Sequence, residues 1–560
     1  MNSTKRVFFL ALLLSLSTQL FAQPRLVLQI TIDGLRGDLL DRYAANLGED
    51  GFNYLLTQGA VYTNAHYLHA NTETIVGHAT LATGATPAVH GMVGNVWYQA
   101  DTGELGYNIE DPDAPLIPTR EQAADGAQVD PAQKRARSSG RSPKGLLAPT
   151  FSDTLKVTNG GNAKVFGISG KDRSAVAMAG KTGIAYWYST NTGDFQSSTY
   201  YMSEYPQWVR TWNEQRMAEA LDGQQWTLLL DRSRYLFAKN DDRPYEVDLK
   251  GYGRTFPHAF GAANHPLFFT RVAVSPEGDR LLLDFGKKLI QAEGIGQDEV
   301  TDYLSISFSG VDAVNHFFGP SSLENEDTVV QLDRTLADLF RFIDKEIGLD
   351  HTLIVLSADH GMAEMPEYAK ELGYEAGRIY NDEILDHARE LSADLYGSQD
   401  FVKDFFRPYL YLDRAAISEK GLEHSTVTEA IANGLAKLPG VGGAIPSHNL
   451  EKQNSSPQTE AIRHNYHRQR SGDIYIFQQP YWFMFERGPI GAMHGSPWAY
   501  DTHVKIIFSG PGIKAAEINR LVHPIDVAPT LSALIGLSPP AAAQGEVLVE
   551  VVSNSDANDR

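Results

Sequence analysis

Carboxylate and imidazole side chains occur close together at two places in the sequence. Asp312 and His316 lie four positions apart in VDAVNHFFGP, so both side chains would lie on one face of a helical turn. Asp359 and His360 are adjacent in SADHG, at the end of an apolar run, and His494 lies among small residues in GAMHGS. Mixed sets of aspartate and histidine favour zinc or a similar transition metal over Ca²⁺ and Mg²⁺, which prefer oxygen ligands.

Other segments carry a hydroxyl nucleophile and groups that suit an anion. In NTETIVGHATLATG, Thr72 or Thr74 would lie at a helix N-terminus, where free N–H groups favour negative charge. Asn95 lies in a turn in GNVWY. Lys171 and Arg173 follow a predicted strand and would point together, toward phosphate oxygens, if the extended conformation continued. Each feature alone also has an ordinary explanation, because threonine caps helices and charged residues usually lie outside.

An α/β core has to position these groups. Four short runs rich in Val, Ile and Leu predict buried central strands at residues 26–33, 303–312, 352–359 and 503–510. Leucine, isoleucine and phenylalanine recur at helical spacing over residues 332–347, which predicts a crossover helix. The alternation is typical of an α/β fold around a mainly parallel sheet.

Three of the four predicted strands end in an aspartate. These residues are Asp33, Asp312 and Asp359. Ligands of an open α/β sheet bind outside the carboxyl ends of its strands. We therefore expect the three carboxylates to converge on one crevice.

The composition excludes several classes of protein. The chain has 560 residues, no cysteine, and 48 Lys+Arg against 69 Asp+Glu, for a formal charge of −21. Without cysteine there is no disulfide framework, thiolate metal site or cysteine nucleophile, so any metal must bind to His, Asp or Glu. The acidic balance argues against nucleic acid as the main partner. An anionic substrate would have to be held by a local site.

The N-terminal segment predicts export. Residues 1–22 combine a basic start, an apolar run shorter than the ~20 residues of a membrane span, and a small residue before a polar stretch. We expect this signal peptide to be cleaved, leaving a periplasmic or secreted protein with no membrane span. Residues 23–560 are predicted to form a single domain, with insertions at about 101–142, 188–271 and 375–485.

Several motifs together resemble the alkaline phosphatase superfamily. They are TIDGLRGDLL, TETIVGHATLATG, HGMVGNVWY, GKDR, SGVDAVNHFFGP, SADHGM, MHGS and YDTHV, in this order over most of the mature chain. Within the superfamily the sequence is most similar to the PafA-like group, zinc-dependent alkaline phosphatases with a threonine nucleophile. The resemblance implies a three-layer sandwich around a mainly parallel central sheet, with inserted subdomains.

The resemblance also implies a role for each candidate residue. Thr74, and not Thr72, matches the nucleophile. The residues that match those holding the phosphoryl oxygens are Asn95, Lys171 and Arg173. Two Zn²⁺ per chain are implied, each with its own set of protein ligands. The zinc that touches Thr74 would be held by Asp33, Asp359 and His360. The zinc facing the leaving group would be held by Asp312, His316 and His494.

The implied activity is hydrolysis of small-molecule phosphate monoesters, through a phosphothreonine intermediate and with an alkaline optimum. We also expect the protein to be a monomer. A phosphodiesterase or nucleotide pyrophosphatase of the superfamily would share the metals, but Lys171 and Arg173 match the extra charge of a monoester. A sulfatase is excluded because there is no cysteine and threonine cannot become formylglycine. A phosphonate hydrolase has no positive support. A secreted metal-binding protein with a vestigial site is disfavoured because nucleophile, ligands and clamp are all present.

Overall fold

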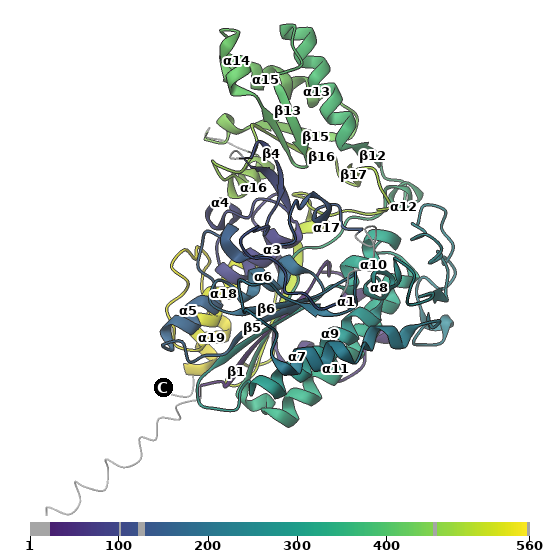
Figure 1. Cartoon of the computed structure of the whole chain (residues 1–560), viewed down its shortest axis with the longest axis vertical. Coiled ribbons are helices and arrows are strands. Elements are labelled where there is room, and N and C mark those ends of the chain that lie inside the picture. Colours follow the sequence, from purple (N-terminus) through teal and green to yellow (C-terminus); the bar gives the residue numbers. More distant parts are fainter. Residues whose placement is uncertain (1–22, 100–101, 121–128, 452–455, 557–560) are drawn as a thin grey trace, which may run out of the picture.

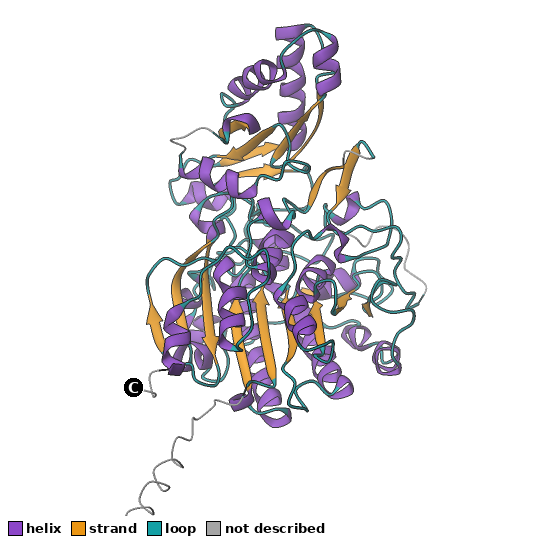
Figure 2. Cartoon of the chain, turned by 90° about the vertical axis from the view of Figure 1, so that its left-hand side faces the viewer, coloured by secondary structure: helices purple, strands orange, loops and turns teal. Residues whose placement is uncertain are grey.

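A nine-stranded sheet forms the centre of the computed structural model, which describes residues 23–99, 102–120, 129–451 and 456–556 (Figures 1 and 2). The predicted signal peptide, residues 1–22, lies outside the described residues. In spatial order the strands are β19 (Ala516–Ile518), β2 (Ala60–His66), β18 (His503–Ser509), β11 (Thr352–Ser357), β1 (Leu26–Ile32), β10 (Asp302–Phe308), β5 (Val165–Ser169), β6 (Ile184–Tyr188) and β7 (Phe195–Gln196).

The middle of this sheet is parallel, as the sequence predicts. β1 pairs in parallel with both β10 and β11, and β10 continues in parallel to β5 and β6. β18, which the sequence predicts as a buried central strand without fixing its direction, runs antiparallel to β11 and to β2. An apolar run does not record strand direction, because a strand buried on both faces has the same composition in either orientation.

Helices cover both faces of the sheet. On β5, a Cβ added at Gly167 would meet helix α6 (Asp172–Ala179), while the side chain of neighbouring Ile168 reaches Gly286 of helix α9 (Pro276–Glu293). Successive strand residues point to opposite faces, so α6 and α9 lie on opposite sides. The helix predicted over residues 332–347 is confirmed as part of α11 (Leu323–Glu346).

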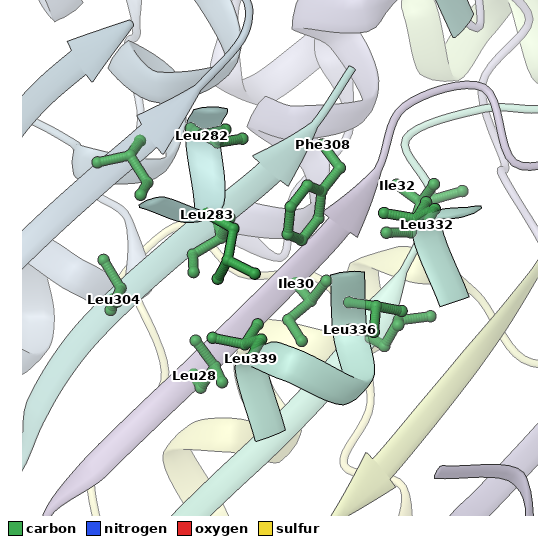
Figure 3. Packing of buried hydrophobic residues seen from close by; sticks show 14 of the residues in the cluster. Leu28, Ile30, Ile32, Leu282, Leu283, Leu304, Phe308, Leu332, Leu336 and Leu339 are labelled. Carbon is green, nitrogen blue, oxygen red and sulfur yellow. The ribbon is translucent and has the colours of Figure 1, made fainter. Parts of the chain in front are cut away.

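Apolar side chains of α9 and α11 close the core against the central strands. Figure 3 shows leucines of the two helices beside the buried side chains of β1 and β10. The residues labelled there are Leu28, Ile30, Ile32, Leu282, Leu283, Leu304, Phe308, Leu332, Leu336 and Leu339. Burying a large apolar side chain contributes about 1.5–3 kcal/mol to the stability of the fold. This packing therefore holds β1 and β10 in place, and the polar residues of the site follow these strands.

A smaller layer lies above the large sheet in both views of the chain (Figures 1 and 2). Its four strands are β13 (Val402–Phe406), β14 (Tyr409–Leu412), β16 (Ile474–Gln478) and β15 (Val441–Pro446), with helices α13 (Asn381–Tyr396) and α15 (His424–Leu435) packed on them. This layer has its own cluster of buried apolar residues. We call the described part of residues 377–485 the cap subdomain.

In their described parts, the other two segments expected as insertions contain short strands, and the second also contains helix α7 (Gln207–Glu214). β4 (Glu104–Tyr107) pairs with β3 (Val96–Gln99), and farther along the chain β8 (Gln225–Trp226) pairs with β9 (His258–Ala259). The division into one domain with three insertions stays a prediction. Among the described helices, none combines the length and the apolar character that crossing a membrane requires.

Close packing of helix α3 (Thr74–Thr83) yields a stability prediction. A Cβ added at Gly77 would lie 2.0 Å from the carbonyl oxygen of Asp359, so Gly77→Ala forces backbone apart. Overpacking of this kind costs about 1–3 kcal/mol, and we expect that fall in the free energy of unfolding measured with urea. Gly488→Ala is the control, since nothing lies within 4 Å of its added Cβ. Equal stability of the two variants would contradict the close contact.

Candidate active site

The strand ends bring three aspartates close together. Asp33 directly follows β1, Asp359 follows β11, and Asp312 lies in the first turn of helix α10 (Gly310–Phe318), just after β10. All three carboxylates are fully buried. Asp312 also lines a cavity of about 510 Å³ together with Asn95, Lys171, Arg173 and other residues.

One set of metal-type ligands is built on Asp312. Its carboxylate lies 3.3 Å from Nε2 of His316, one helical turn along α10, and 3.7 Å from Nε2 of His494. Nδ1 of His316 hydrogen-bonds to the carbonyl of Ala492, and Nδ1 of His494 to that of Thr72. These contacts leave both Nε2 atoms facing Asp312, an arrangement typical of metal-binding histidines.

A second set surrounds His360. Its Nε2 lies 3.3 Å from Asp33 and 3.4 Å from Asp359, while Nδ1 contacts the carbonyl of Gly361. Ligand atoms of Asp33, Asp312 and His360 lie within 4.8 Å of one another, as do those of Asp312, His316 and His494. Asp312 therefore lies close to both sets, and Asp359, which the resemblance places in the second set, approaches the same nitrogen of His360.

Buried polar atoms without partners fit a metal at these sets. Among the described residues, no hydrogen bond of good geometry reaches either carboxylate oxygen of Asp33, Oδ1 of Asp312, Oδ2 of Asp359 or Nε2 of His360. Buried polar atoms are nearly always satisfied, and metal ions held at the two sets would satisfy these. The carboxylate and imidazole donors suit zinc-type metals better than Ca²⁺ or Mg²⁺.

Lys171 neutralises part of this charge. Its Nζ lies 2.7 Å from Asp33 and also contacts Asp312. Burial alone would lower the pKa of Lys171, but Asp312 and Asp33 raise it above its ordinary value. Burial likewise opposes protonation of His360, yet Asp359 and Asp33 raise the pKa of this imidazole to about 9. The carboxylate cluster thus attracts any cation within reach.

Thr74 begins helix α3 and lies beside Arg173. Its Oγ accepts a hydrogen bond from Nη2 of Arg173 at 3.3 Å, and Nη1 of the same guanidinium binds Asp130 at 2.6 Å. Asn95 precedes β3 and accepts the backbone N–H of Ile75 at 3.3 Å. The sequence thus brings hydroxyl, amide and guanidinium together at the start of one helix.

Lys171 and Arg173 reach the site from the start of a helix and not from an extended segment. The extended conformation, in which both side chains would point the same way, does not continue, because α6 begins at Asp172. Lys171 caps this helix and Arg173 lies in its first turn, so their side chains diverge to the carboxylates and to Thr74 respectively.

Sequence reasoning missed the groups that hold these residues. Glu73, next to Thr74, accepts hydrogen bonds from the Asn95 backbone N–H and from Arg407. Asp130 fixes Arg173. Arg407 lies 334 positions from Glu73, and no local pattern marks it. The only sequence signal for Glu73 is its place beside the candidate nucleophile.

Comparisons with known proteins agree with this geometry. Residues 27–497 match the model of the type I phosphodiesterase / nucleotide pyrophosphatase family. The chain is 31% identical to alkaline phosphatase PafA of Elizabethkingia meningoseptica, over 96% of each chain. It is 32% identical to alkaline phosphatase PhoV of Synechococcus elongatus, over 96% of this chain and 94% of that one. A protein named calcium-transporting ATPase from Myroides odoratus is also 32% identical, over 96% of both.

A solved structure supports the same family relationship. The crystal structure of wild-type alkaline phosphatase PafA matches with a TM-score of 0.86 and 30% identity, over 95% of this chain and 99% of that one. The predicted α/β fold class is thereby confirmed. The chain therefore belongs to the type I phosphodiesterase / nucleotide pyrophosphatase family and, within the alkaline phosphatase superfamily, to its PafA-like group.

Proposed function

We propose that the chain is an alkaline phosphatase that hydrolyses phosphate monoesters to an alcohol and inorganic phosphate, with Thr74 as the nucleophile. The observation that carries this proposal is the position of the Thr74 hydroxyl, which contacts Arg173 at the start of α3. The same helix packs against Asp359, and His78 lies 3.1 Å from the Asp359 carboxylate. Relatives named alkaline phosphatase, similar over nearly the whole chain, support it.

Two zinc ions per chain would be held by the two ligand sets. Asp33, Asp359 and His360 would hold one beside Thr74, and Asp312, His316 and His494 the other. Bound zinc would supply the positive charge that a phosphate dianion and its departing oxygen require. In the structure the ammonium group of Lys171 neutralises Asp33 and Asp312. With metal held at these carboxylates, the ammonium group would be free to contact the phosphoryl oxygens.

The side chains of this chain then account for the reaction. Thr74 Oγ, after losing its proton to solvent, attacks phosphorus and forms a phosphothreonine bond. The ester P–O bond breaks, and the alcohol oxygen leaves with the bonding electrons and takes up a proton from water. Water subsequently attacks phosphorus and releases Thr74 and phosphate. The guanidinium of Arg173, with Asn95 and Lys171, would stabilise the equatorial oxygens as their charge spreads. Activity should rise toward alkaline pH because the attacking oxygens must lose protons.

Glu73 is not available as a general base. One of its oxygens accepts from Arg407 and the other from Asn95 and Asn71. A phosphodiesterase activity, which the family description also names, is the second candidate. A diester carries one negative charge fewer, so a site in which Lys171 left the carboxylates and joined Arg173 at the phosphoryl group would favour the monoester.

We also propose that the protein is exported as a monomer and acts in the periplasm or outside the cell. The basic, apolar and small-residue pattern of residues 1–22 supports export.

Removing the nucleophile gives the first activity test. Thr74→Ala should lower kcat for a phosphate monoester by roughly 10³-fold or more, with bound zinc retained, because the covalent step is lost. Thr72→Ala is the matched control, since its hydroxyl contacts the carbonyl of Ser496 and not Arg173. It should keep most of its activity. Near-normal turnover by Thr74→Ala would refute the assignment.

Charge recognition is tested by removing both cations. Lys171→Ala combined with Arg173→Ala should lower kcat/KM for nitrophenyl phosphate by about 10²–10³-fold, as loss of transition-state donors does. The matched diester, measured in the same preparations, should lose much less. If monoester and diester activities fell equally, the pair would have no part in recognising the extra charge.

Metal dependence is tested by chelation. Exhaustive EDTA dialysis should abolish turnover, and added Zn²⁺ should restore it, because the buried carboxylates and imidazoles need a cation to form the site. Mg²⁺ alone should restore little, since it prefers oxygen ligands. An unchanged rate after complete removal of metal would overturn the metal-dependent reaction.

A further inference from the structure

A buried ion pair links the cap subdomain to the start of helix α3. Arg407 lies between β13 and β14, and its side chain is 1% exposed; that of its partner Glu73 is 2% exposed. Nη2 of Arg407 donates to Oε1 of Glu73 at 2.8 Å. Nη1 donates to the carbonyl of His494 at 2.6 Å and to that of Gly495 at 3.0 Å. One guanidinium therefore joins three segments.

Glu73 links Arg407 to Asn95 and, through Asn95, to the start of helix α3. Its Oε2 accepts the backbone N–H of Asn95, and the Asn95 side chain accepts the N–H of Ile75. Thr74 lies between Glu73 and Ile75 in the chain. The position of the hydroxyl, of the amide and of the His494 loop thus depends on the same pair of charges.

A second contact from the cap subdomain holds the same loops. Asn465, at the end of helix α16 (Pro457–Asn465), donates to the carbonyl of Val93 at 3.1 Å and accepts the N–H of Asn71 at 3.2 Å. These contacts flank Thr74 and Asn95 in the sequence. The cap subdomain therefore holds both loops. Among the hydrogen bonds of the described residues, that of Arg407 joins the cap subdomain to His494.

The energetics favour a role in orientation. A buried ion pair gains little net stability, because the cost of removing both charges from water offsets their attraction. Its hydrogen bonds, in contrast, are directional and strong. The fit is also tight at Gly495, where an added Cβ would lie 2.4 Å from Nη1 of Arg407. Displacing Arg407 would let the three segments move independently.

We propose that Arg407 is a positioning residue through which the cap subdomain fixes Thr74 and Asn95 relative to His494. The inference rests on the proposed function, because it assigns Arg407 a part in placing the nucleophile and one predicted metal ligand. Arg407 does not touch the reacting atoms and acts only through Glu73 and through the backbone of residues 494 and 495.

The test uses Arg407→Lys, Arg407→Met and the neutral pair Glu73→Gln with Arg407→Met, which avoids an unpaired buried charge. We expect kcat on a phosphate monoester to fall by about 10²-fold in Arg407→Met, with a smaller change in KM, since misplacement mainly affects the transition state. Zinc affinity, measured by chelator competition, should fall by about 10-fold, as when support of a metal ligand is lost. Arg414→Met, which removes an exposed arginine paired with Asp473 in the same subdomain, is the control.

A double-mutant cycle separates positioning from general stability. If Arg407 acts through Asn95, Arg407→Lys should cost several-fold less activity in an Asn95→Ala background than in the wild type. Equal costs in both backgrounds, wild-type kinetics and zinc affinity in the neutral pair, or unfolding of all three variants would overturn the proposal. If the wild type itself fails to hydrolyse monoesters, the proposed function is wrong, and the zinc affinity of the variants still tests the support of His494.

Discussion

The arrangement of the site depends on three carboxylates that are buried close together and need positive charge beside them. Asp33, Asp312 and Asp359 are fully excluded from solvent, although like charges repel and desolvation opposes ionisation. Such a cluster requires cations. In the structure Lys171 and His360 supply positive charge, and unsatisfied oxygens remain for a metal. Because a metal replaces protons and ammonium groups at the same atoms, metal loading and freeing of Lys171 are expected to occur together.

The fold delivers these groups from distant parts of the chain. The carboxyl ends of β1, β10 and β11 place the aspartates, the α3 N-terminus places Thr74, and the cap subdomain contacts the loops around them. A mutation in the cap subdomain can therefore alter the site without contacting substrate. The pairing of Arg407 with Glu73 is the clearest structural reason to regard cap and sheet as one functional unit.

Sequence patterns predicted local features well and long-range ones poorly. Asp312 and His316 share a helical face because a four-residue spacing fixes it, and β1, β10 and β11 follow from apolar composition. The antiparallel direction of β18 and the helical start at Asp172 depend on tertiary contacts that no short window contains. The partners Asp130 and Arg407 are likewise absent from any motif, because their role exists only when folding joins distant segments.

Anomalous diffraction at the zinc edge from crystals of the zinc-loaded protein tests the central claim most directly. The account predicts two zinc peaks, one among Asp33, Asp359 and His360 and one among Asp312, His316 and His494, with Nζ of Lys171 withdrawn from both aspartates. No peak at either set, or Lys171 still bound to Asp33 and Asp312 in the loaded protein, would contradict it.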